Sequence, residues 1–111
     1  MECNVKHLGT GVVVVSLDGR LNMASAATLR QTIASLVQEG ASRFAVDLSR
    51  ITFMDSSGLG ALISGLKTAR QAGGDLRIAA PTEQVQLVLQ LTNMERVLTP
   101  YDSPETAFTS A

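Results

Sequence analysis

The spacing of apolar residues predicts alternating strands and helices along the first half of the chain. A β-branched run over residues 12–17 and an alternating segment over residues 43–48 are typical of strands with a buried face. A weaker strand pattern at residues 5–8 precedes the turn Gly9-Thr10-Gly11, which predicts an opening β-hairpin. Between the strands, helical spacing predicts a first helix that buries Leu29, Ile33, Leu36 and Val37, with Asn22 or Ser25 as its cap.

The second half of the chain repeats this alternation. A second helix follows residues 51–53, and Gly73-Gly74 ends it before a strand at residues 76–80. A third helix is expected to begin at Thr82 with Glu83. Its apolar stripe is wider than one buried face requires, so part of it could meet a partner; the stripe consists of Val85, Leu87, Val88, Leu89 and Leu91.

The C-terminal region predicts an edge strand at residues 97–99 and a short last helix that begins at residues 103–105 and contains Ala107 and Phe108, with fraying final residues. Residues 18–22 are expected to be a loop, and residues 49–50 lead from the strand over residues 43–48 into the central segment. Strands that alternate with helices favour parallel neighbours in a sheet. We therefore expect one α/β domain (α+β in some schemes) over residues 1–111, with a mixed sheet, an opening hairpin and about four covering helices.

Composition narrows the possible functions. The chain has 111 residues, 45% of them hydrophobic, which suits one compact core. Its formal charge of −1, with nine dispersed basic residues, gives no electrostatic footprint for nucleic acid or an anionic membrane. Cys3 is the single cysteine, so no intramolecular disulfide can form, as suits a reducing cytosol. No signal pattern and no apolar run of ~20 residues is present, so we expect a cytoplasmic protein without membrane insertion.

The segment over residues 54–60, Met-Asp-Ser-Ser-Gly-Leu-Gly, joins the short apolar run to the second helix, whose buried face is predicted from Leu59, Leu62, Ile63 and Leu66. Asp55, Ser56 and Ser57 are residue types that accept hydrogen bonds from the first helical turn. The partial positive charge of a helix start would tolerate a phosphate on Ser57. Gly58 and Gly60 are expected to leave the backbone open to another protein. The alternative is that both serines only cap the helix.

Other chemistry is poorly supported. A serine hydrolase would need a base, and the sole imidazole is His7; the serines also lack the Gly-x-Ser-x-Gly pattern. The Gly58-Leu59-Gly60 stretch lacks the third glycine of a dinucleotide fingerprint, and no P-loop is present. Carboxylates are dispersed without metal-ligand spacing, at Asp18, Asp47, Asp55 and Asp75. The sequence indicates a protein that is not an enzyme and needs no cofactor or metal.

Four segments in order resemble the STAS family: residues 12–17, 19–22, 46–48 and, above all, 53–60. Within that family the chain looks like a stand-alone bacterial anti-sigma factor antagonist. The resemblance covers nearly all of the chain. It implies a phosphorylation switch in which the unphosphorylated protein binds a serine kinase that is also an anti-sigma factor, and so frees the sigma factor.

The resemblance places the phosphorylated serine on Ser57 and implies that phosphorylation abolishes binding. It gives Asp55 and Ser56 the roles of holding the loop and contacting the kinase, and it implies partner contacts at Asn22, Gly58 and Leu59. The kinase would supply ATP and magnesium, and a metal-dependent phosphatase would restore the hydroxyl. Separately from the resemblance, we expect the chain to be a monomer.

Two residues depart from the family pattern. Many relatives carry an acidic residue at the position of Asn22, and often another at the position of Arg20. Asn22 offers a hydrogen-bond acceptor but no charge to a kinase. The alternative function is a non-switching STAS adaptor subunit of a lipid-transport or signalling complex, in which Ser57 remains unmodified.

Overall fold

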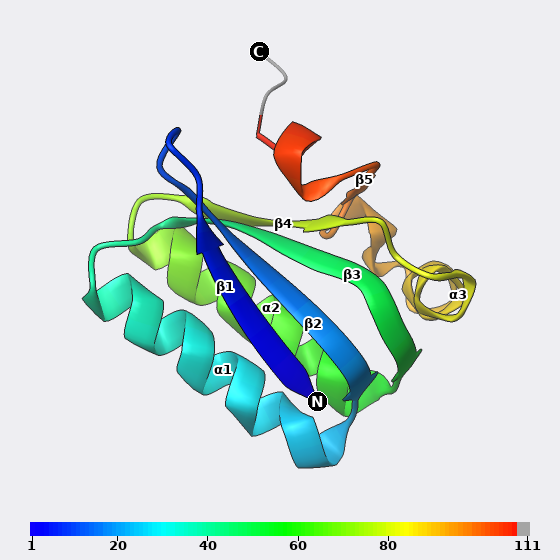
Figure 1. Ribbon diagram of the computed structural model, residues 1–111. Coiled ribbons are helices and arrows are strands. Elements are labelled where there is room, and N and C mark those ends of the chain that lie inside the picture. The colour runs from blue at the N-terminus through cyan, green and yellow to red at the C-terminus, as the bar shows by residue number, and fades with distance from the viewer. Residues whose placement is uncertain (109–111) are drawn as a thin grey trace.

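A five-stranded mixed sheet forms the centre of the protein in the computed structural model, which describes residues 1–108 (Figure 1). The strands lie side by side in chain order and are β1 (Glu2–His7), β2 (Val12–Leu21), β3 (Arg43–Met54), β4 (Asp75–Ala79) and β5 (Pro100–Tyr101). β1 is antiparallel to β2, and every later pair is parallel. The predicted mixed sheet with an opening hairpin is confirmed.

Residues 1–108 form three α-helices, α1 (Met23–Gln38), α2 (Ser56–Gln71) and α3 (Glu83–Leu91), and two 3-10 turns, η1 (Met94–Arg96) and η2 (Pro104–Thr106). α1 and α2 lie next to each other under one face of the sheet, and α3 packs against β3 (Figure 1). Within this part of the chain, no helix combines the length and apolar character that a bilayer span requires. The expected last helix is only the turn η2, so about four helices was one too many; the predicted fraying concerns residues 109–111, outside the described residues.

Several predicted boundaries are wrong. β2 continues through Gly19 to Leu21, because two register shifts relative to β3 accommodate its polar residues within the strand. Gly19 takes a positive φ of 112° there, a conformation that suits glycine. β3 runs unbroken from residue 43 to residue 54, so it extends beyond the strand expected over residues 43–48. The edge strand is Pro100–Tyr101 and not residues 97–99. Leu98, at the centre of the predicted strand, is instead buried in the core.

The two faces of the sheet bury different residues. Phe44, Val46 and Leu48 alternate along β3 and pack into the large core beneath α1 and α2. The predicted helical faces join that core through Leu29 and Leu62, among others. The opposite face carries a smaller cluster made of Val12, Val14, Ala45 and Ala107, with Leu8, Tyr101 and Phe108 packed against it. The C-terminal turn therefore covers part of the second face.

Candidate functional site

The segment over residues 54–60 forms a strand-to-helix turn, as predicted. β3 ends at Met54, and α2 begins at Ser56. The N–H of Asp55 donates to the carbonyl of Leu21 over 3.3 Å, which holds the turn against the end of β2. α1 begins directly after β2, and β2 is the parallel neighbour of β3. The first turns of α1 and α2 therefore lie at the same end of the sheet, beside the C-terminal ends of β2 and β3.

Asn22 is the N-cap of α1 and Asp55 is the N-cap of α2. Ser56 and Ser57 do not cap α2. The carboxylate of Asp55 accepts a hydrogen bond of 2.9 Å from the N–H of Gly58. The side chain of Asn22 accepts from the N–H groups of Ala24 and Ser25, at 3.0 and 3.3 Å, and the Ser25 hydroxyl accepts from the N–H of Asn22. Asn22 and Ser25 thus form one capping box, and the reading in which Ser56 and Ser57 only cap α2 is wrong.

Both serine hydroxyls are available. Ser56 is exposed and Ser57 is half-exposed, and within residues 1–108 neither side chain makes a hydrogen bond. Ser57 precedes Gly60 by three residues, so the two lie on one side of α2. On that side, the Nη2 atom of Arg30 lies 3.9 Å from the position that a Cβ on Gly60 would occupy. A guanidinium of α1 therefore lies beside α2 at Gly60, one helical turn further along the helix than Ser57.

Gly58 is buried, contrary to the expectation that it leaves the backbone open. A Cβ at this position would lie 2.8 Å from Cγ of Leu21 and 2.9 Å from its carbonyl carbon. Only a residue without a side chain lets the start of α2 come this close to β2. Gly58 serves packing within the chain, whereas Gly60 is partly exposed and meets only Arg30.

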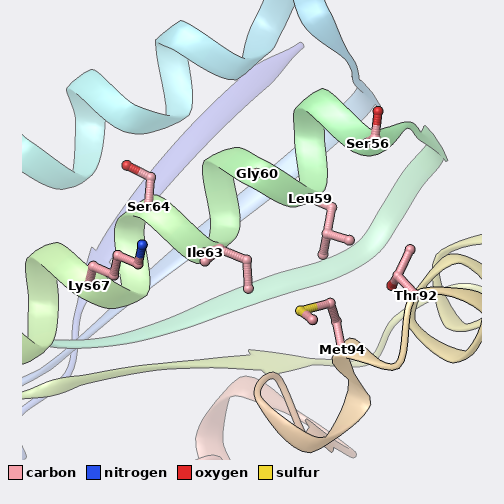
Figure 2. Close-up of a pocket in the computed structure, with 8 residues that line it drawn as sticks. All are labelled: Ser56, Leu59, Gly60, Ile63, Ser64, Lys67, Thr92 and Met94. Atoms are coloured by element: carbon pink, nitrogen blue, oxygen red, sulfur yellow. The ribbon is translucent and has the colours of Figure 1, made fainter.

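An open groove of about 430 Å³ runs along α2 from Ser56 towards Lys67 (Figure 2). Leu59 and Ile63 give it apolar walls, and Thr92 and Met94 close the other side. No pattern in the sequence predicts Thr92 and Met94 as lining residues. The helical spacing predicts Ile63 on the buried face of α2, but Ile63 is only partly buried because it lines this groove.

Gln84 of α3 fixes the end of β3 through its side-chain amide. Its side-chain oxygen accepts from the N–H of Met54 over 2.8 Å, and its side-chain nitrogen donates to the carbonyl of Met54 over 2.9 Å. The amide thus replaces a neighbouring strand at this point. No local pattern distinguishes Gln84 from the other glutamines of α3, so the sequence carries no signal for it.

Exposed apolar side chains lie on the elements around this turn. They are Met23 at 77% exposure, Phe53 at 40%, Leu87 at 52% and Leu91 at 75%. In α3, Val85 and Leu89 face the core, whereas Leu87 and Leu91 of the same apolar stripe are exposed. The part of the stripe that exceeds one buried face is therefore on the surface.

The groups that a hydrolase would need are not beside Ser57. His7 pairs with Val13 near the start of β2, whereas the site lies at the other end of that strand. Cys3 lies on β1, as His7 does. Burial raises the pKa of the Cys3 thiol, and the hydrogen bond to Thr32 lowers this pKa by less. Among residues 1–108, no three His, Cys, Asp or Glu side chains are grouped to hold a metal.

Comparison with known proteins identifies the family. The STAS domain model matches residues 5–107, and the chain belongs to this family. A Thermotoga maritima protein described as a candidate anti-sigma factor antagonist is 29% identical over 93 residues, covering 83% of this chain and 82% of the relative. A crystal structure under that description from the same organism matches with a TM-score of 0.86, over 95% of this chain and 90% of the other.

Other relatives bear the same kind of name. The anti-sigma F factor antagonist of Paenibacillus polymyxa is 27% identical over 100 residues, covering 89% of this chain and 86% of the relative. The phosphorylated form of the Bacillus protein SpoIIAA matches with a TM-score of 0.73, over 95% of this chain and 96% of the other. At 21% identity, that likeness concerns the fold alone. The relatives are thus regulators named for their action on anti-sigma factors.

Proposed function

We propose that this protein is an anti-sigma factor antagonist that acts by phosphorylation-controlled partner switching. Unphosphorylated, it binds a serine kinase that is also an anti-sigma factor, and so releases the sigma factor. Phosphorylation of Ser57 abolishes that binding. The observation that carries the proposal is a pair of serine hydroxyls without partners in the described chain, at a helix start that is flanked by exposed apolar side chains.

The surroundings of Ser57 suit a protein partner. Isolated exposed apolar residues are common, but Met23, Phe53 and Leu91 lie on three elements that adjoin the same turn. Apolar and aromatic side chains at the centre with a polar rim are typical of protein interfaces. The groove along α2 continues from Ser56 and offers a further apolar contact, mainly through the partly exposed Ile63, because Leu59 is only 7% exposed.

A phosphate on Ser57 would be tolerated by the fold. The first turn of α2 carries partial positive charge, and the Arg30 guanidinium lies beside the same helix at Gly60. Inside an interface fitted to a hydroxyl, the same group adds roughly −1.5 to −2 charges and three oxygens, which must lose water on binding. Release of the partner then follows, while the antagonist stays folded.

The remaining site residues divide into contact and support. Ser56 and Leu59 line the groove and are proposed to contact the partner. Asp55 holds the turn, and Gly58 lets it pack against β2. The side-chain oxygen of Asn22 already accepts two N–H groups, so its contact with the kinase is made from a side chain fixed in place by the cap.

In this proposal the chain is a substrate and ligand, not an enzyme, and it acts in the cytoplasm as a monomer without a cofactor of its own. The kinase supplies ATP and magnesium, and a metal-dependent phosphatase removes the phosphate. Chemical transfer from ATP places the phosphoryl group on the Ser57 oxygen, releases ADP and gives the hydroxyl proton to the kinase.

Mapping of the phosphorylated residue tests the assignment. The protein and its Ser57→Ala and Ser56→Ala variants are incubated with the cognate kinase and ATP, and the site is located by mass spectrometry. We expect one phosphate on Ser57 in the unchanged protein and in Ser56→Ala, and none in Ser57→Ala. Phosphate on Ser56 alone, or on neither serine, would overturn the assignment.

A further inference from the structure

A second, strongly basic cavity lies at the other end of α2. Its volume is about 170 Å³, and its walls include three arginines from separate elements: Arg70 of α2, Arg77 of β4 and Arg96 of η1. Asp75 is the single acid among its lining residues, and Thr99 and Tyr101 add hydroxyl groups. The formal charge of the lining is therefore +2, in a chain whose net charge is −1.

The three arginines differ in how many of their N–H donors have a partner within the described chain. Asp75 is shared, because it meets Nε of Arg70 at 3.4 Å and Nε of Arg77 at 3.2 Å. Nη1 of Arg77 also donates to the carbonyl of Ala107 over 2.8 Å. The side chain of Arg96 is exposed and makes no ion pair or hydrogen bond within residues 1–108. Donors on Arg70 and Arg96 are thus left for a ligand, and the single carboxylate cannot neutralise three guanidinium groups.

Arg77 is held in a fixed orientation. Its guanidinium lies 4.4 Å from the ring centroid of Phe108 and 5.7 Å from that of Tyr101. Together with the bonds to Asp75 and Ala107, these contacts remove most of the rotamer freedom that a surface arginine would lose on binding. The cavity therefore presents at least one preorganised cationic wall.

We propose that this cavity binds a small phosphate-type oxyanion. Guanidinium groups match phosphate oxygens in geometry, and the surplus of +2 fits a dianion better than a monocarboxylate. The volume of about 170 Å³ lies below the ~300–1,000 Å³ of sites for drug-sized molecules, which favours free phosphate or the phosphate end of a small metabolite. The helix dipole places roughly half a negative charge at the C-terminal end of α2, which disfavours an anion there. This partial charge is smaller than the net charge of +2 on the cavity lining.

The proposal stands apart from the Ser57 switch. Arg70 follows Ser57 by thirteen residues of α2, which corresponds to roughly 20 Å along a helix. The two sites share no lining residue, so the failure of one proposal leaves the other untouched. The alternative is that the arginines only stabilise the C-terminal turn through Asp75 and the aromatic rings.

Titration followed by NMR tests the proposal on the full chain. Inorganic phosphate is added at constant ionic strength in a buffer without phosphate, and the backbone amides of Leu76 and Thr99 are followed. We expect saturable shifts near the cavity at millimolar concentrations or below. A parallel titration with glycerol 3-phosphate identifies the source, because tighter binding of the ester indicates a phosphorylated metabolite and equal or weaker binding indicates free phosphate.

Two matched variants decide whether the cavity is responsible. Arg96→Gln removes a guanidinium without a partner in the described chain, so the fold is retained, and phosphate binding should weaken roughly tenfold. Arg50→Gln removes the same charge from β3, outside this cavity, where its pair with Asp18 is largely exposed, and binding should be unchanged. Absence of saturation in the unchanged protein, or equal weakening in both variants, would overturn the proposal.

Discussion

Alanine substitution of Gly58 and of Gly60 makes the same chemical change two residues apart and should have opposite effects on stability. Both positions lie in α2, where replacing glycine by alanine stabilises by roughly 0.5–1 kcal/mol in the absence of contacts. At Gly60 the new Cβ meets only the Arg30 guanidinium at 3.9 Å, which is an ordinary contact. We therefore expect Gly60→Ala to raise the free energy of unfolding by about this amount.

At Gly58 the new Cβ would press into the backbone and side chain of Leu21, with 2.8 Å to its Cγ. Leu21 is fully buried, and its carbonyl accepts the Asp55 N–H, so it cannot move aside without disturbing the turn. Overpacking of this kind costs about 1–3 kcal/mol, which exceeds the gain in helix propensity. We expect Gly58→Ala to lower the free energy of unfolding by about 1–2 kcal/mol net.

Urea unfolding followed by far-UV circular dichroism measures both variants; the chain has no tryptophan for fluorescence. The midpoint should fall for Gly58→Ala and rise for Gly60→Ala, with the denaturant slope unchanged in both. A Gly58→Ala variant as stable as Gly60→Ala would show that α2 does not pack against β2 as described.

Two further predictions concern the elements that support the site. Leu62 is fully buried whereas Ile63 lines the groove. Leu62→Ala should therefore lower the free energy of unfolding by ~2–5 kcal/mol, and Ile63→Ala should lower it by clearly less. Equal losses of stability in thermal unfolding would mean that α2 is rotated about its axis relative to this description. Gln84→Ala leaves the N–H and carbonyl of Met54 without their partners and should cost about 1–3 kcal/mol, whereas Gln90→Ala on the exposed side of α3 should be nearly neutral; the idea fails if the two variants unfold together.

The order of the elements could be predicted from sequence because each apolar period is local. The run over residues 12–17 and the helical spacing around Leu29 and Leu62 depend only on which residues face the core. Strand ends were harder, because Asp18, Gly19 and Arg20 look like a loop in isolation. They remain in β2 because register shifts against β3 absorb the irregularity, and that pairing depends on a segment some thirty residues away.

The site shows the same limit. The helix start at Asp55 and Ser56 follows from residue types that cap helices, and it was predicted correctly. The contact between Gly58 and Leu21 and the capture of Met54 by Gln84 join segments that are distant in the chain, and no local pattern encodes them. The local sequence therefore predicts an exposed Gly58, although the absence of a side chain at Gly58 serves packing in the interior.

The binding of the kinase/anti-sigma partner to phosphorylated and unphosphorylated protein tests the central proposal most directly. Isothermal titration calorimetry is carried out on the unchanged protein, on the same protein phosphorylated at Ser57, and on Ser57→Ala, with circular dichroism to verify folding. We predict that the phosphorylated protein stays folded and loses affinity, that Ser57→Ala still binds, and that Ser57→Asp is weakened to a lesser degree, because a carboxylate has less charge and fewer oxygens than a phosphate. Undiminished affinity of the phosphorylated protein would contradict switching and favour a permanent adaptor.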